Sequence, residues 1–326
     1  MPRRVTMKRE EFYFDSRNGS DKIYAVRYTP DEGEIRGVVQ IIHGMSEHIG
    51  RYEEFARFLT EKGFVVTGDD HLGHGKSVPQ RGTYGYFCEQ DPATVVVRDV
   101  HRLKKLTQAA YPGVPYIILG HSMGSFILRN YLCRYGTGID GAVIMGTGMQ
   151  KKSLVVVGKA VAGLQCLFGG SRRESRLLNQ LAFGSFGKKL DNPKTESDWL
   201  TKEPEMVDRY LEDPHCGFVF TANGFRTLFE LVSRIQKREN LEKIPADLPI
   251  FMLSGKDDPV GEYGAGVQRA YASLKAVGIK DITLKLYEGD RHELLNETDR
   301  ETVMQDIDNW MESHIAALSG GQRQNI

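Results

Sequence analysis

The chain has 326 residues, of which 40% are hydrophobic and 26% are charged, enough for one large globular domain with an insertion or for two modest domains. Its 43 Lys and Arg residues balance its 43 Asp and Glu residues, which argues against nucleic acid as a partner because phosphate binding needs a basic excess or patch. The four cysteines stand far apart without a CxxC pair, which favours free thiols in a reducing compartment over a disulfide framework.

The chain begins with a charged stretch. Residues 1–11 contain no apolar core of the kind that a secretory signal needs, so we expect no export signal. No run of about 18 apolar residues is evident, so we also expect no membrane-spanning segment. Both observations favour a cytoplasmic location.

Short apolar strands and amphipathic helices alternate through the first half of the chain. Residues 11–14 and 22–28 mix aromatic and β-branched residues with polar ones, as a half-buried antiparallel pair does. Further strands are predicted at 37–42, 64–67, 116–119 and 142–145, and helices at 51–62, 95–110 and 125–135. This order predicts an α/β fold with a mostly parallel sheet and helices on both faces.

The alternation lapses after residue 147. An apolar stretch at 154–168 is followed by a polar segment rich in Gly and Pro, and the whole interruption is too long for a connecting loop. Residues 148–221 are therefore predicted to form an inserted cap at the carboxyl edge of the sheet, where α/β proteins bind ligands. Residues 1–147 and 222–326 form the predicted core, with helices at 225–235, 265–276 and 301–318 and strands at 249–253 and 283–286.

The sharpest motif is the pentapeptide GHSMG at 120–124, which stands between a predicted strand and a predicted helix. A nucleophile elbow needs such a tight strand-to-helix turn, and its glycines let backbone approach backbone without a Cβ clash. The turn exposes the hydroxyl of Ser122 above the sheet, beside a helix N-terminus that favours a developing anion. We therefore predict that Ser122 is a nucleophile rather than an ordinary turn serine.

A serine hydroxyl needs a base to take its proton, and behind such an elbow the acid and the histidine follow the serine along the chain. His292 follows the strand predicted at 283–286 and is the predicted general base. Two carboxylates follow the strand predicted at 249–253. Of these, Asp258, which directly precedes a proline, is preferred over Asp257 as the group that orients His292.

The negative oxygen of a tetrahedral intermediate needs preorganised backbone donors. The residue after the nucleophile supplies one N–H group, which here belongs to Met123. The loop that follows the strand predicted at 37–42 is expected to supply the second from Met45. A plain strand-to-helix turn is the alternative interpretation of this loop.

The apolar stretch at 154–168 has two interpretations. It forms the core of a small subdomain, or it lines an acyl pocket and touches lipid, and both hold if the faces of one helix differ in role. The candidate substrate-binding residues are Gly44, His121, Leu154, Leu164, Leu167 and Phe168.

Four histidines lie near one another in the sequence and raise the question of a metal site. His71 and His74 stand three residues apart, and His43 and His48 precede them. No Cys or carboxylate completes a recognisable ligand spacing, so no metal is expected.

Several motifs, in this order, resemble those of one known family. The chain resembles the monoacylglycerol lipases and bacterial lysophospholipases, in the serine aminopeptidase-like branch of the α/β-hydrolases. The resemblance covers roughly residues 20–316 and rests on HGMSEH at 43–48, RY at 51–52, DHLGHGKS at 70–77, GHSMG at 120–124, DPHCG at 213–217, DPV at 258–260 and YEG at 287–289 with His292.

The resemblance implies an α/β-hydrolase fold with an eight-stranded sheet and a helical cap. It also implies no cofactor and hydrolysis of monoacylglycerols, lysophospholipids or simple esters. The family's catalytic residues fall on Ser122, Asp258 and His292, and its oxyanion donors fall on Met45 and Met123.

Several further interpretations stand beside this resemblance. The apolar cap allows transient contact with a membrane or micelle, and the oligomeric state is undetermined. Glu47, His48 and Arg51 either hold a polar head group or, as we prefer, form a structural ion pair. The alternative functions are an aminopeptidase-like peptidase of the same branch and a non-catalytic ligand-binding protein with this fold.

Overall fold

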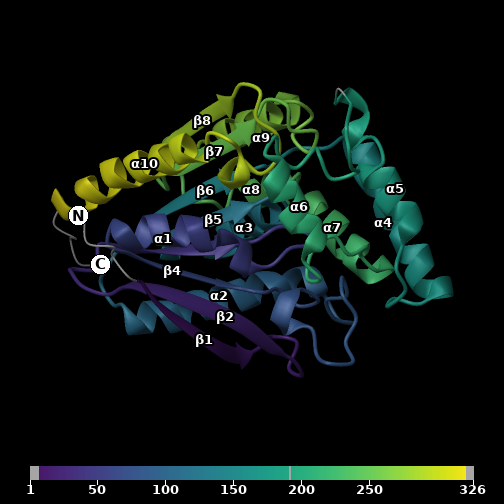
Figure 1. The fold of residues 1–326 in the computed structure, drawn as a ribbon, viewed down its shortest axis with the longest axis horizontal. Helices are drawn as coiled ribbons and strands as arrows, with labels where there is room; N and C mark the ends of the chain where they lie inside the picture. The colour runs from purple at the N-terminus through teal and green to yellow at the C-terminus, as the bar shows by residue number, and fades with distance from the viewer. Residues whose placement is uncertain (1–6, 191, 321–326) are drawn as a thin grey trace.

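One eight-stranded sheet organises the molecule, and the predicted α/β-hydrolase architecture is confirmed (Figure 1). The computed structural model describes residues 7–190 and 192–320, so the first six residues of the charged N-terminal stretch lie outside the described part. The strand order is β1-β2-β4-β3-β5-β6-β7-β8. The strands span β1 (Met7–Asp15), β2 (Lys22–Pro30), β3 (Gly37–Ile42), β4 (Phe64–Asp69), β5 (Tyr116–His121), β6 (Gly141–Met145), β7 (Ile250–Gly255) and β8 (Ile282–Tyr287).

The direction of the strands explains their sequence patterns. β1 and β2 form the predicted antiparallel pair, and the six strands from β3 to β8 run parallel to one another. Every residue of β3 to β7 is buried, which is why these strands read as continuous apolar runs rather than alternating ones. The carboxyl ends of the parallel strands all meet at one edge of the sheet, where the predicted site residues follow β3, β5, β7 and β8.

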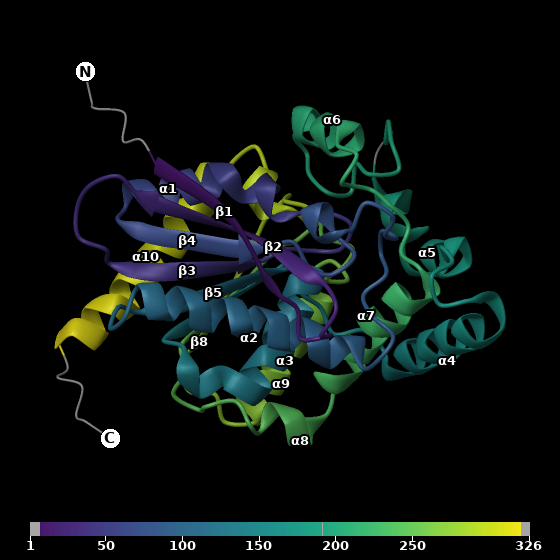
Figure 2. The same ribbon diagram turned by 90° about the horizontal axis from the view of Figure 1, so that it is seen from below.

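Helices cover both faces of the sheet, and each face has its own hydrophobic core (Figure 2). On one face, α1 (Glu53–Glu61) and α10 (Arg300–Gly320) pack with residues such as Phe55 and Ile307. Trp310 of α10 stacks on Phe251 of β7, with 5.6 Å between the ring centroids. The other face carries α2 (Pro92–Ala110), α3 (Met123–Tyr135), α7 (Ala222–Arg234) and α9 (Ala265–Ala276).

Four helical segments lie between β6 and α7, within the range predicted as the cap. They are α4 (Lys152–Gly169), α5 (Arg176–Phe183), the short 3-10 helix η4 (Phe186–Lys189) and α6 (Pro204–Glu212). Both views place α4 and α5 at one end of the molecule, beyond the sheet, with α6 set apart from them (Figures 1 and 2). The remaining short elements are η1 (Ile49–Tyr52), η2 (Gly75–Ser77), η3 (Gly136–Gly138), α8 (Arg238–Leu241) and η5 (Leu294–Asn296).

Helix α4 corrects one expectation from the sequence. In the described residues it is a single 18-residue helix, long and apolar enough by length and composition to cross a membrane. The apolar stretch at 154–168 has 15 residues, which is too short to cross a membrane. The residues on either side of it extend the helix to 18 residues. Only Val155, Gly158 and Ala162 of this helix are buried, and these pack one face of it toward α7.

Candidate active site

Ser122 occupies a strained turn between β5 and α3. Its backbone has φ 54° and ψ −121°, outside the regions that most L-residues adopt, and its N–H donates to the carbonyl of Met145 at 3.0 Å. A Cβ atom on Gly124 would lie 2.0 Å from the carbonyl oxygen of Ile42, so only glycine fits this approach of α3 to β3. Ser122 is half-buried and lines a large cavity, as a nucleophile elbow requires.

His292 and Asp258 meet at the same edge of the sheet. Nδ1 of His292 lies 3.0 Å from Oδ2 of Asp258, and both side chains are buried. The N–H direction at Nδ1 is not aligned for a hydrogen bond, and catalytic hydrogen bonds often tighten only in the transition-state complex. Asp258 is held by the N–H of Val260 at 2.8 Å and the hydroxyl of Ser254 at 3.2 Å, whereas Asp257 is exposed.

The predicted oxyanion donors flank the nucleophile. Met45 and Met123 both line the cavity together with Ser122. Met123 is the first residue of α3, so its N–H has no acceptor one turn earlier in the helix. A Cβ atom on Gly44 would lie 3.0 Å from Cβ of Ser122, which shows how closely the loop after β3 approaches the nucleophile.

The cavity above Ser122 has a volume of about 1530 Å³ and is walled by the cap. That volume exceeds the roughly 300–1,000 Å³ of ordinary small-molecule pockets, so the cavity has room for more than a small ester. Gly44, His121 and Leu154 lie in its wall as predicted. The apolar part of the wall includes Phe126, Val155, Val161, Leu178, Phe183, Leu228, Phe229 and Val232.

Three predicted acyl-pocket residues lie elsewhere. Leu164, Leu167 and Phe168 are not in the cavity wall, and they are 57%, 74% and 81% exposed at the C-terminal end of α4. The sequence could not separate these residues from Leu154 because the stretch is apolar on all sides. Which part of the helix reaches the cavity is decided only by how the helix packs.

His121 needs a different correction. It lies in the cavity wall, but both of its ring nitrogens face groups of the protein. The ring therefore offers no free polar atom to a substrate.

Sequence reasoning missed the aromatic residues that the cap brings to the site. The ring of Trp199 lies 5.1 Å from the ring of His292, and Phe186 also lines the cavity. Tyr263, which belongs to the core, lines the same cavity. Trp199 and Phe186 stand in the polar, Gly- and Pro-rich part of the insertion, where no periodicity marks a functional face. Only the return of this segment over the sheet places them there.

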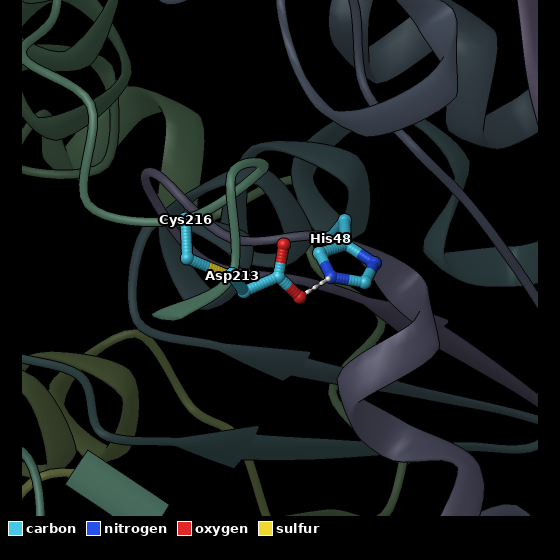
Figure 3. A group of neighbouring side chains, drawn as sticks. All are labelled: His48, Asp213 and Cys216. Atoms are coloured by element: carbon cyan, nitrogen blue, oxygen red, sulfur yellow. Dashed lines mark hydrogen bonds and ion pairs between the residues drawn. The ribbon is translucent and has the colours of Figure 1, made fainter. Parts of the chain in front are cut away.

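His48, Asp213 and Cys216 form a group that a metal ion could bridge, since one potential ligand atom from each lies within 4.8 Å of the others (Figure 3). Nδ1 of His48 accepts the N–H of Gly50 at 3.2 Å, so the ring proton is on Nε2, which donates to Asp213 at 2.9 Å. A metal at Nε2 needs a lone pair there. The arrangement fits a link between the loop after β3 and the end of the cap better than it fits a metal site.

The histidines at 71 and 74 are also structural. His71 pairs with Asp69 at 3.1 Å, and both side chains are fully buried. His74 lies among the rings of Phe87, Phe218 and Phe220, and burial lowers its pKa to about 3. Neither histidine meets a second carboxylate or a cysteine that completes a metal site among the described residues.

The elbow serine, the acid–histidine pair and the capped α/β sheet define a serine hydrolase of the α/β-hydrolase fold. A family model described as "Serine aminopeptidase, S33" matches residues 33–299. The chain belongs to this family.

Similar proteins agree with this class over nearly the whole chain. The monoacylglycerol lipase of Mycolicibacterium smegmatis is 31% identical over 95% of this chain and 100% of its own length. The monoglyceride lipase of Rattus norvegicus is 28% identical over 94% of this chain and 91% of its own. A thermostable carboxyl esterase from Bacillus coagulans, solved in complex with glycerol, superposes with a TM-score of 0.88 at 32% identity, covering 95% of this chain and 100% of that one.

Proposed function

We propose that this protein hydrolyses monoacylglycerols through an acyl-enzyme on Ser122. The observation that carries the proposal is a half-buried elbow serine that opens into a cavity of about 1530 Å³ with apolar cap residues in its wall. The protein is a carboxylic ester hydrolase, in agreement with its lipase and esterase relatives. Those relatives, together with the apolar wall, favour a fatty-acyl glycerol over a peptide as the substrate.

In this mechanism His292 takes the proton of the Ser122 hydroxyl while Oγ attacks the ester carbonyl carbon. Asp258 holds the imidazole in the tautomer that leaves Nε2 free, and it stabilises the imidazolium that forms. The N–H groups of Met45 and Met123 bind the carbonyl oxygen as it becomes negative. His292 then protonates the departing glycerol oxygen, and a water molecule that gives its proton to His292 releases the fatty acid.

We further propose that residues 148–221 act as a lid with one fixed and one looser part. The second half is tied to the core: Leu200 accepts the N–H of Glu293 at 2.7 Å, and Lys202 pairs with Asp290 at 2.5 Å. In the first half, residues 148–194, α4 contacts the core mainly through α7 and exposes most of its surface. Motion of α4 relative to the fixed half would open the cavity to a lipid chain.

The substrate is tested by the rate of fatty-acid release from monoacylglycerols of increasing chain length. We expect kcat/KM to peak at medium or long chains, because the apolar wall stabilises each added methylene by roughly 0.8 kcal/mol. Lysophospholipids and aminoacyl arylamides of matched length serve as comparators. Activity confined to acetyl esters, or higher kcat/KM on arylamides than on esters, would refute a long-chain monoacylglycerol substrate.

We also propose that the protein acts in the cytoplasm and docks reversibly on anionic lipid surfaces through the first half of the cap. Its four cysteines are free, as suits a reducing compartment. Residues 148–194 contain six lysines and three arginines but only Glu174 and Asp191 as acids. The exposed apolar side chains of the same region are Leu154, Val156, Val157, Leu164, Leu167, Phe168, Leu177 and Leu181. Apolar side chains that insert and cations that attract anionic head groups together make an interfacial surface.

Docking is tested by sedimentation with vesicles of phosphatidylglycerol or phosphatidylcholine. We expect binding to phosphatidylglycerol that weakens with salt, and a loss of roughly tenfold or more when Leu167 and Phe168 are both replaced by Ser. Leu106→Ser is the matched control, because Leu106 is exposed on α2 and far from the cap in sequence. Equal binding to both vesicle types, or equal loss in the control, would contradict this docking surface.

A further inference from the structure

A buried network of charged side chains lies behind Ser122. Arg51 donates to Glu47 at 2.7 Å, and through both terminal nitrogens to the two carboxylate oxygens of Glu293, each at 2.7 Å. Glu47 and Arg51 thus form the ion pair preferred from the sequence, whereas His48 pairs with Asp213 instead. The same carboxylate of Glu47 accepts the hydroxyl of Tyr52 at 2.8 Å and lies 3.3 Å from Nδ1 of His121.

Both ring nitrogens of His121 face hydrogen-bond acceptors. Nε2 lies 3.2 Å from the carbonyl oxygen of His292, which can only accept. Nδ1 lies 3.0 Å from the hydroxyl oxygen of Tyr52, which has already donated its proton to Glu47. A neutral imidazole carries one ring proton and would turn a lone pair toward one of these acceptors. The 3.3 Å approach of Nδ1 to the Glu47 carboxylate favours a proton on each nitrogen.

The charge balance agrees with a protonated His121. Two buried carboxylates, Glu47 and Glu293, face one guanidinium, so a second cation is needed for neutrality, and unpaired buried charge is strongly unfavourable. Burial by itself lowers the pKa of His121, but the hydrogen bond and charge of Glu47 and the charge of Glu293 outweigh it and raise that pKa. Burial alone would raise the pKa of Glu47, yet its bond to His121 and the charge of Arg51 hold it well below its usual range.

The network touches each part of the machinery. His121 directly precedes Ser122, and its ring lies 4.8 Å from the ring of His292. Glu47 accepts the N–H of Gly44 at 2.5 Å, which fixes the loop that carries Met45. The charged and titratable groups around His121 are Glu47, Arg51, Tyr52, His292 and Glu293, with Tyr210 of α6 over Arg51 at 4.9 Å.

We propose that His121 is a buried imidazolium that positions the loop of His292 and the oxyanion loop around Ser122, and whose charge favours the oxyanion. This inference rests on the proposed function of Ser122. Both ring nitrogens of His121 face protein groups and leave no polar atom for the substrate, so we assign it as a positioning residue. Its positive charge acts through a water-poor interior, where a nearby charge counts for more than it does in water. Loss of the proton removes this charge and one of the two loop contacts.

The pH dependence follows from the sign of the shift. Because the pKa of His121 is raised in the fold, the paired network persists below that pKa and is lost as pH rises through it. Activity of the wild type should therefore fall on the alkaline side. Glu47→Gln removes the group that does most to raise this pKa, so the same fall should move to lower pH.

The test measures kcat and KM for a short-chain monoacylglycerol from about pH 6 to about pH 10, a range that spans histidine titration. For His121→Gln we expect no alkaline fall in activity and a KM that is nearly unchanged. Its kcat should be about tenfold to a hundredfold lower, because the charge-assisted hydrogen bonds of the imidazolium are lost. The matched control is Asp99→Asn, because Asp99 is equally buried but bonds to Ser16 and Arg17 on α2's side of the sheet. It should keep the wild-type profile.

A second measurement does not depend on turnover or on any variant of the network. In ¹⁵N-histidine-labelled Ser122→Ala protein, the two ring nitrogens of His121 should both report as protonated below the alkaline fall. One unprotonated ring nitrogen there would overturn the inference, as would an alkaline fall that His121→Gln retains or Glu47→Gln leaves in place. Failure of the proposed function would instead appear as hydrolysis that does not need Ser122 at any pH.

Discussion

Replacing Ser122 by Ala should lower kcat by about 10⁴-fold to 10⁶-fold while the protein stays folded. The chemical reason is that no other group at the elbow can form the acyl-enzyme, so only the oxyanion donors and the binding cavity remain to assist water. The fold should persist because main-chain contacts hold the elbow: Ser122 N–H donates to Met145, and its carbonyl accepts from Ser125. Alanine preserves all of these contacts.

The measurement is fatty-acid release beside a thermal unfolding curve for each variant. Ser125→Ala is the matched control, since Ser125 lies in the first turn of α3 and, among the described residues, its hydroxyl bonds only the carbonyl of Ser122 at 2.6 Å. We expect that control to lose less than about tenfold in kcat and about 1 kcal/mol in the free energy of unfolding. Comparable activity of Ser122→Ala and the wild type would rule out Ser122 as the nucleophile.

Asp258→Asn should lower kcat by about 10⁴-fold at neutral pH. The amide keeps the shape of the carboxylate, and its oxygen can still accept from Val260. Its charge is lost, however, and its NH₂ group favours the wrong tautomer of His292, with the proton on Nε2 where a lone pair must receive the serine proton. The loss should therefore be in kcat with little change in KM.

Asp257→Asn is the natural control, because the two acids are adjacent in sequence but differ in surroundings. Asp258 is fully buried against His292, whereas Asp257 is exposed and its N–H bonds the carbonyl of Asp290. We expect Asp257→Asn to keep kcat within about twofold, as for most surface substitutions. A larger loss in Asp257→Asn than in Asp258→Asn would transfer the orienting role to Asp257.

Much of the fold was accessible from local pattern. The runs at 37–42 and 116–119 fall within β3 and β5, and the helix predicted at 265–276 matches α9 (Ala265–Ala276) in full. Such elements are either strands buried on both faces of a parallel sheet or helices that end at clear glycine and proline signals. The local sequence is therefore enough to define them. Boundaries were less accurate at α3, which starts at Met123 rather than at 125 because the elbow turn leads directly into the helix.

Some residues of the candidate site follow from the order of the strands, whereas others depend on the packing of side chains. Ser122, Asp258 and His292 could be named in advance because parallel strands bring their carboxyl ends to one edge, so residues that follow those strands must lie near one another. The loop residue Met45 could be named for the same reason. None of these inferences needs the packing of one side chain against another.

What only tertiary structure decided is which face of each element meets which neighbour. Leu154 reaches the cavity and Phe168 does not, although both belong to one apolar helix, because Leu154 lies near the start of α4 beside the cavity and Phe168 lies near its exposed end. Likewise Trp199 meets His292, and Arg51 bridges to Glu293, across separations in sequence of about 93 and 242 residues. Such contacts come from long-range packing of side chains, and a one-dimensional pattern of hydrophobicity and charge carries no information about that packing.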